Sequence, residues 1–119
     1  MRALIVDDDA TFCQLLAKIL QREGFETEGT TDSLIGYDLA LHNQYDLYIF
    51  DVRMPGFLGT ELVEGVKEAS PHAKILLLSA FADTALRQTA RDLEVVLLPK
   101  PFTVAQLLAE ITDLLHGSA

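Results

Sequence analysis

The sequence has few of the residues that several classes of protein require. It contains a single cysteine, Cys13, so no internal disulfide can form, and this fits a reducing compartment such as the cytoplasm. Its 9 basic residues face 18 acidic ones, and the net charge of −9 argues against a general nucleic-acid binder and a basic membrane anchor. The apolar run after Met1 stops at Asp7, and no run approaches the length of a bilayer. We therefore expect a cytoplasmic protein without a signal peptide, a membrane partner or direct contact with nucleic acid.

The length and composition predict one globular domain over residues 1–119. A domain averages about 150 residues, and no Gly-, Ser- or Pro-rich linker, repeat or low-complexity tract divides this chain. Half of the residues are hydrophobic and 23% are charged, which is typical of globular proteins. A domain of this size buries roughly two thirds of its unfolded surface, so its core needs no structural metal or disulfide.

Short apolar runs alternate with amphipathic stretches along the chain. The runs predict five strands, at residues 3–6, 25–30, 47–50, 74–78 and 95–98, and the second is polar enough to be a solvated edge strand. Helical spacing and capping residues predict five helices, at residues 12–20, 33–42, 59–70, 83–91 and 103–115. Such alternation indicates a parallel sheet covered by helices on both sides.

Polar residues follow or end four of the predicted strands. They are Asp7-Asp8-Asp9, Asp51, Ser79 and Lys100. Doubly wound parallel sheets bind ligands beyond the carboxyl ends of their strands, so we expect these side chains to converge in one pocket.

The chemistry of these side chains favours phosphoryl transfer. Two carboxylates 4 Å apart repel each other by about 4 kcal/mol at an effective dielectric constant near 20, and a divalent cation relieves that repulsion. Magnesium suits one or two carboxylates together with a phosphoryl oxygen, and the lysine and the hydroxyl can meet further anionic oxygens. A carboxylate can itself be the nucleophile. Asp51 is the best candidate, because it ends a central strand and precedes the Met54-Pro55-Gly56 turn.

Four motifs follow one another along the chain: residues 3–9, Asp51 with Met54-Pro55-Gly56, Ser79-Ala80 and Lys100-Pro101-Phe102. Together they resemble the receiver domain of bacterial two-component response regulators. The resemblance covers the whole chain, and the ordered set is highly specific. It implies a three-layer, doubly wound, flavodoxin-like α/β fold with five parallel strands in the order 2-1-3-4-5 and five helices. It also implies a signalling module that catalyses only its own phosphorylation and dephosphorylation, not an enzyme with an external product.

The resemblance assigns the phosphoryl acceptor and the metal ligands. Asp51 would accept the phosphoryl group from the phosphohistidine of a sensor histidine kinase or of a histidine phosphotransfer protein. Asp7, Asp8, Asp51 and the backbone carbonyl of Arg53 would bind Mg²⁺, with Mn²⁺ as a substitute.

It also assigns the residues that meet the phosphoryl group. Ser79 would donate its hydroxyl to that group, and Lys100 would pair with it. The bond between Lys100 and Pro101 is expected to be cis, which is a proline-specific feature. Arg53 and Phe81 lie two residues beyond Asp51 and Ser79, so we expect both to overhang the pocket, with Phe81 excluding the hydrolytic water.

Two positions depart from the pattern of the family. Leu97 stands where a Tyr or Phe is frequent, and Leu93-Glu94 stands where Gly-Ala is usual. Neither change touches the phosphorylation chemistry. Both bear on how the signal reaches the surface formed by the fourth helix, the fifth strand and the fifth helix, because a switch needs an element with two arrangements.

Two other functions remain open from the residues alone. One is a protein-interaction module on the same fold that acts without phosphorylation. The other is a phosphatase of the haloacid dehalogenase type, but that class needs a second acid two residues after the nucleophile, where this chain has Arg53. The sequence does not identify the kinase, the downstream output domain or protein, or whether two copies form a homodimer.

Overall fold

Five parallel strands form one sheet in the order β2-β1-β3-β4-β5, as predicted. The computed structural model describes residues 1–116, so the last three residues of the predicted domain lie outside the described residues. The strands are β1 Arg2–Val6, β2 Glu26–Thr30, β3 Leu47–Asp51, β4 Ile75–Ser79 and β5 Val96–Pro99. The helices are α1 Ala10–Arg22, α2 Ser33–His42, α3 Gly59–Ala69, α4 Thr84–Asp92 and α5 Val104–His116.

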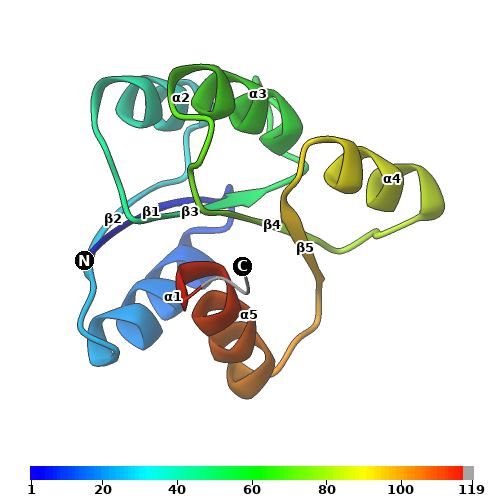
Figure 1. Cartoon of the computed structure of the whole chain (residues 1–119). Coiled ribbons are helices and arrows are strands. Elements are labelled where there is room, and N and C mark those ends of the chain that lie inside the picture. Colours follow the sequence, from blue (N-terminus) through cyan, green and yellow to red (C-terminus); the bar gives the residue numbers. More distant parts are fainter. Residues whose placement is uncertain (117–119) are drawn as a thin grey trace.

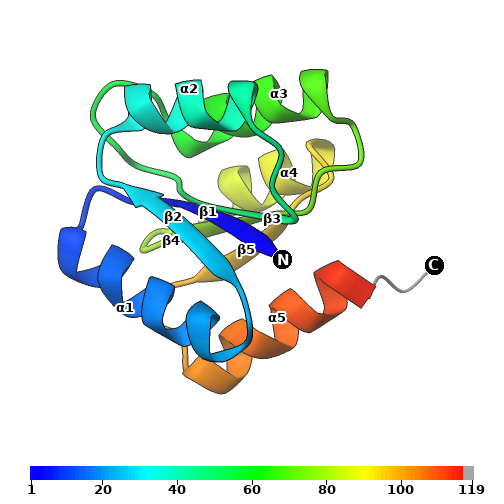
Figure 2. The ribbon, with the colours of Figure 1, turned by 90° about the vertical axis from the view of Figure 1, so that its left-hand side faces the viewer.

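The sheet lies between two layers of helices, which confirms the three-layer architecture. Helices α2, α3 and α4 cover one face, and α1 and α5 cover the other (Figures 1 and 2). Successive side chains of β1 point to opposite faces: Ala3 and Ile5 pack with α1 and α5, whereas Leu4 and Val6 pack with α2 and α3. Both faces of the central strands are therefore buried, which explains why these strands are continuous apolar runs.

The strands at the two edges of the sheet differ from the central ones. All residues of β3 and β4 are buried, whereas no residue of β2 is. The Glu and Thr residues of β2 fit the solvated edge strand that the sequence predicted. Strand β5 forms the other edge, where the missing N–H of Pro99 costs no hydrogen bond of the ladder. Within residues 1–116, no helix combines the length and the apolar character that crossing a membrane requires.

Acidic and hydroxyl side chains cap four of the five helices. The side chains of Asp9, Asp32 and Asp83 accept hydrogen bonds from the first-turn amides of α1, α2 and α4. Thr103 and Gln106 exchange the two bonds of a capping box before α5. These caps stabilise the starts of α1, α2, α4 and α5, which follow the loops at the carboxyl ends of the strands.

The predicted boundaries of β4 and β5 were early by one residue. The apolar runs end at Leu78 and Leu98, but the backbone ladder continues to Ser79 and Pro99, which are partners in the register. The ladder then closes with the Lys100 amide, which donates to the Ser79 carbonyl at 2.7 Å. Pairing depends on the backbone and not on polarity, so Ser79 is a strand residue with a fixed position.

The turn between α4 and β5 contains Leu93-Glu94 in place of the usual Gly-Ala. Glu94 takes the left-handed conformation, with φ +58°, in which residues other than Gly, Asn and Asp are uncommon. Its carbonyl accepts a hydrogen bond from the Lys67 ammonium of α3 at 3.3 Å. Glu94 therefore holds a left-handed backbone conformation although it is not glycine, and this strain reduces the stability of the fold.

Candidate functional site

Three carboxylates meet at the carboxyl ends of β1 and β3. Val6 pairs with Phe50 in the register, so Asp7 lies beside the last residue of β3, Asp51. Asp7, Asp8 and Asp51 each offer an oxygen within 4.8 Å of the others. Asp7 is 1% exposed and Asp51 is 8% exposed, whereas Asp8 is exposed at the mouth. The pocket thus has two buried acids at its floor and one that solvent reaches.

Lys100 reaches this cluster from the edge of the sheet. Its Nζ lies 3.1 Å from an oxygen of Asp7 and 3.5 Å from an oxygen of Asp51. The other oxygen of Asp7 accepts from the Asp9 amide at 2.9 Å. The Lys100–Pro101 peptide bond is cis. One ammonium therefore contacts two of the three carboxylates, and the cluster keeps a net negative charge.

The electrostatics of the pocket oppose the ionisation of Asp51. Burial, and then the charge of Asp7, raise the pKa of Asp51 from 3.8 to about 6, although Lys100 partly offsets them. Burial acts to lower the pKa of Lys100, but its hydrogen bond with Asp7 and the charges of Asp51 and Asp7 outweigh burial, so that pKa is raised. An all-oxygen donor set with excess negative charge fits a hard divalent cation such as Mg²⁺.

Ser79 lies at the end of β4, next to β3, and is buried. Its hydroxyl oxygen accepts a hydrogen bond from the Phe81 amide at 3.0 Å. A hydroxyl has one hydrogen to donate as well, so this contact leaves the O–H of Ser79 for another acceptor.

Arg53 and Phe81 lie together in the loops after β3 and β4. The guanidinium carbon of Arg53 is 5.8 Å from the centre of the Phe81 ring, and the Phe81 side chain is 70% exposed. The two residues line a cavity of about 380 Å³ with Leu58 and Leu86, between the start of α3 and α4. Leu97 lies on β5, half-buried, and packs with the residues between the sheet and α2, α3 and α4.

Two residues near the cluster have contacts that the sequence did not indicate. Ser33, the first residue of α2, donates its hydroxyl to the Pro55 carbonyl at 2.6 Å and accepts from the Phe57 amide at 2.9 Å. It therefore ties α2 to the loop that follows Asp51. Phe12, in the first turn of α1, lies with its ring centre 4.4 Å from the Lys100 Nζ.

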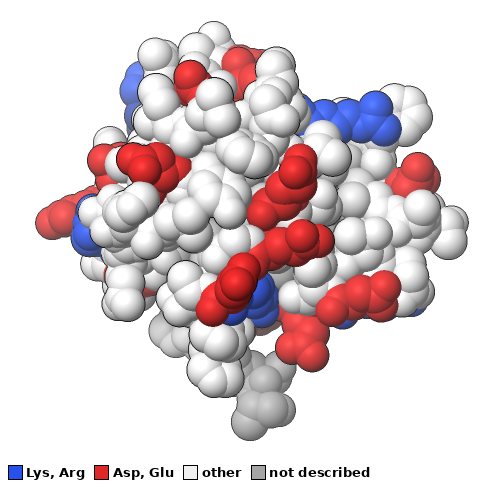
Figure 3. All heavy atoms as spheres, turned by 90° about the horizontal axis from the view of Figure 1, so that it is seen from above, with Lys and Arg blue, Asp and Glu red and all other residues white. Residues whose placement is uncertain are grey.

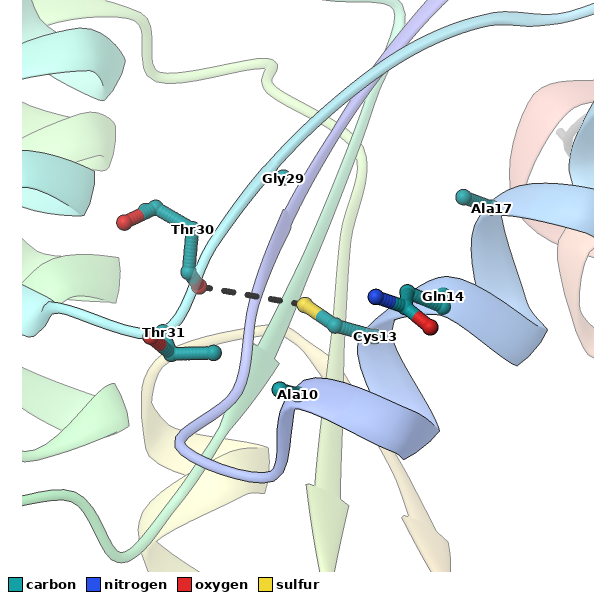
Figure 4. Close-up of a pocket in the computed structure, with 7 residues that line it drawn as sticks. All are labelled: Ala10, Cys13, Gln14, Ala17, Gly29, Thr30 and Thr31. Atoms are coloured by element: carbon teal, nitrogen blue, oxygen red, sulfur yellow. Dashed lines mark hydrogen bonds between the residues drawn. The ribbon is translucent and has the colours of Figure 1, made fainter.

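A separate cavity of about 480 Å³ lies between α1 and β2 (Figure 4). Its one thiol, Cys13, points toward the Thr30 carbonyl, 3.8 Å from the sulfur (Figure 4). Burial, and then the charge of Asp7, raise the pKa of the Cys13 thiol, which keeps it protonated and unreactive. Cys13 is buried, as expected for a structural thiol.

The charge of the surface agrees with the composition. On the face seen from above, over α2, α3 and α4, acidic side chains are spread widely with few basic ones among them (Figure 3). Such a face does not present the basic stripe that tracks a phosphate backbone.

Comparisons with known proteins give one consistent family. The sequence model described as response regulator receiver domain matches residues 3–112. The chain is 35% identical over 120 residues to the transcriptional regulatory protein CusR of Escherichia coli K12, covering 100% of this chain and 53% of CusR. The chain thus spans about half the length of this curated relative.

Solved structures of receiver domains superpose on the fold. A CheY-like receiver domain protein from Methanospirillum hungatei gives a TM-score of 0.91 at 28% identity, covering 97% of this chain and 93% of that one. TrrA from Thermotoga maritima, in complex with Mg²⁺–BeF, gives 0.84 at 28% identity, covering 95% and 97%. A response regulator from Burkholderia pseudomallei with a phosphorylated aspartic acid and a calcium ion gives 0.85 at 25% identity, covering 95% and 68%.

Proposed function

Because this chain belongs to the response regulator receiver domains, a family of signalling modules, we propose that Asp51 is its phosphoryl acceptor. The donor would be the phosphohistidine of a sensor histidine kinase or of a histidine phosphotransfer protein. The observation that carries the proposal is the position of Asp51, a buried carboxylate at the end of β3 with two further carboxylates and one ammonium around it.

In the transfer, an Asp51 oxygen attacks the phosphorus as the bond from the histidine nitrogen to phosphorus breaks. An ionised carboxylate is needed, and with a pKa of about 6 Asp51 is ionised at neutral pH. Lys100, whose pKa is raised, keeps its charge and would pair with the transferred group, and Ser79 would donate its hydroxyl to it. These contacts supply positioning and charge stabilisation, which are what phosphoryl transfer needs from a protein.

Asp7, Asp8, Asp51 and the backbone carbonyl of Arg53 would hold a divalent cation, Mg²⁺ first and Mn²⁺ as a substitute. When bound, the cation shields the negative charge between the carboxylates and the phosphoryl oxygens. The donor set of three carboxylates with one ammonium supports this part of the proposal. TrrA, at 28% identity, is a relative that carries Mg²⁺ with BeF.

The output belongs to the proposal as well. CusR is a transcriptional regulatory protein, and this chain covers 53% of its length. We propose one receiver domain over residues 1–119 that acts in the cytoplasm through a downstream domain or protein, without touching nucleic acid itself.

Leu97 cannot move a hydroxyl between a buried and an exposed position as Tyr can, so α4 and the loops would carry the change in shape. Sedimentation before and after phosphorylation measures whether two copies pair.

Intact mass after incubation with acetyl phosphate tests the proposal. Wild type should gain one base-labile phosphoryl group with Mg²⁺ and none without it, and Asp51→Asn should gain none. Asp9→Asn is the matched control: Asn caps a helix as well as Asp does, and Asp9 lies outside the cluster, so uptake should persist. If wild type gains nothing from acetyl phosphate or from a phosphorylated histidine kinase, the proposal is wrong and a phosphorylation-independent interaction module takes its place.

A further inference from the structure

The ammonium of Lys100 has an aromatic partner as well as acidic ones. Its Nζ lies 4.4 Å from the centre of the Phe12 ring, inside the roughly 6 Å range of a cation–π interaction. We propose that Phe12 is a positioning residue, whose ring holds the Lys100 ammonium at the acidic cluster for phosphoryl transfer. The inference rests on the proposed function, because meeting the phosphoryl group is the task assigned to Lys100.

The ring of Phe12 is held in place from two sides. Its backbone amide donates to the Asp9 side chain at 3.1 Å, so it belongs to the capped first turn of α1. Its ring meets the Phe102 ring edge to face, with centres 5.9 Å apart and planes at 71°. Phe102 follows Lys100 by two residues, so one short segment supplies both the ammonium and the brace for its partner ring. The contact therefore joins two ordered elements.

The acidic partners of Lys100 do not hold it through the whole reaction. Asp7 and Asp51, its two carboxylate contacts, are also the residues proposed to bind the cation, and Asp51 becomes esterified. A bound cation draws on the same oxygens and repels the ammonium. Lysine is a flexible chain that keeps one geometry only while something holds it. The ring of Phe12 is neutral and binds no metal, so its attraction for the ammonium persists when the carboxylates are occupied.

Two substitutions separate this role from simple packing. Phe12→Leu keeps an apolar side chain on the face of α1 but removes the ring, and it should slow phosphoryl uptake about three- to tenfold, the range of a partly desolvated cation–π contact. Replacing Phe12 by mono-, di- and trifluorinated phenylalanine keeps the ring but withdraws charge from its face. The logarithm of the uptake rate should then fall steadily with the number of fluorines. Trifluorination of Phe25, which is buried in the hydrophobic core against which Phe12 packs, is the control and should leave the rate unchanged.

A measurement without metal or phosphoryl donor completes the test. The chain has four lysines, so their ε-methylene signals can be resolved by NMR and that of Lys100 assigned from Lys100→Met. In wild type the Lys100 signal should be shifted upfield by the ring current, and in Phe12→Leu it should join the other three. A Lys100 signal that lies with the others in wild type would overturn the inference. Equal uptake rates across the fluorinated series would also overturn it, because they would show that Phe12 acts only as an apolar packing residue.

The two proposals fail separately. If wild type takes up no phosphoryl group, the proposed function fails, whereas the NMR signal still decides whether the ring holds the ammonium. If uptake is normal in wild type and the signal does not respond to Phe12→Leu, the function stands and the positioning role is wrong.

Discussion

Neutralising Asp51, the proposed phosphoryl acceptor, should make the metal-free protein more stable. An aspartate in the unfolded chain has its ordinary pKa of 3.8, whereas the pKa of Asp51 in the folded protein is about 6. Between these pH values the folded state keeps a proton that the unfolded state has released, so the free energy of unfolding falls as the pH rises through this window. Above it, the ionised Asp51 costs the fold roughly 3 kcal/mol. Asp51→Asn, which cannot ionise, escapes that cost.

Chemical denaturation of both proteins without divalent ions measures this effect. At about pH 7.5, Asp51→Asn should exceed wild type by about 2–3 kcal/mol, or roughly 10 °C in melting temperature, and near pH 4 the two should coincide. Saturating Mg²⁺ should narrow the gap, because a cation held by the full set of carboxylates stabilises wild type more. If Asp51→Asn is no more stable at neutral pH, or keeps its advantage in acid, the reasoning about the buried charge is refuted.

Three further substitutions test separate parts of the structure. Glu94→Gly should raise the free energy of unfolding by about 0.5–1 kcal/mol in urea, because relief of the left-handed strain exceeds the entropy cost of glycine; a less stable variant would contradict the strain. Gly59→Ala should lose at least about 2 kcal/mol in the same assay, because the new Cβ would lie 2.3 Å from the Asp51 carbonyl oxygen. The control Gly29→Ala, with its closest contact at 3.6 Å, should lose much less, and equal losses would contradict the clash. Phe81→Asn should speed loss of the phosphoryl group several-fold, measured by intact mass over time, and an unchanged rate would show that the ring excludes no water.

The convergence of the acidic cluster could be predicted from the sequence, because it follows directly from the strand pattern. Parallel strands share an end, so an acid after β1, an acid ending β3 and a lysine after β5 meet wherever the strands pair. The second strand is a similar case: its Glu and Thr residues predicted a solvated edge, and β2 is one.

Contacts that depend on the lateral placement of elements were beyond the sequence. The two partners of Ser33 lie 22 and 24 residues away, and no periodicity encodes which loop passes beside a helix start. The ring of Phe12 meets Lys100 only because α1 and the end of β5 approach across the sheet. Likewise, Leu93-Glu94 showed that the usual Gly-Ala was missing, but not that Glu94 would take the left-handed conformation.

The span of the chain that builds the pocket has a consequence for synthesis and assembly. Asp7 and Lys100 are 93 positions apart, and Asp51 lies between them. A nascent chain therefore carries the acid pair long before its counter-ion leaves the ribosome, and no contiguous fragment that lacks either end of this span holds the whole cluster. Under the proposed function, uptake of a phosphoryl group therefore requires that β1, β3, β4 and β5 have all paired. A truncated or half-folded copy would accept no phosphoryl group from a kinase.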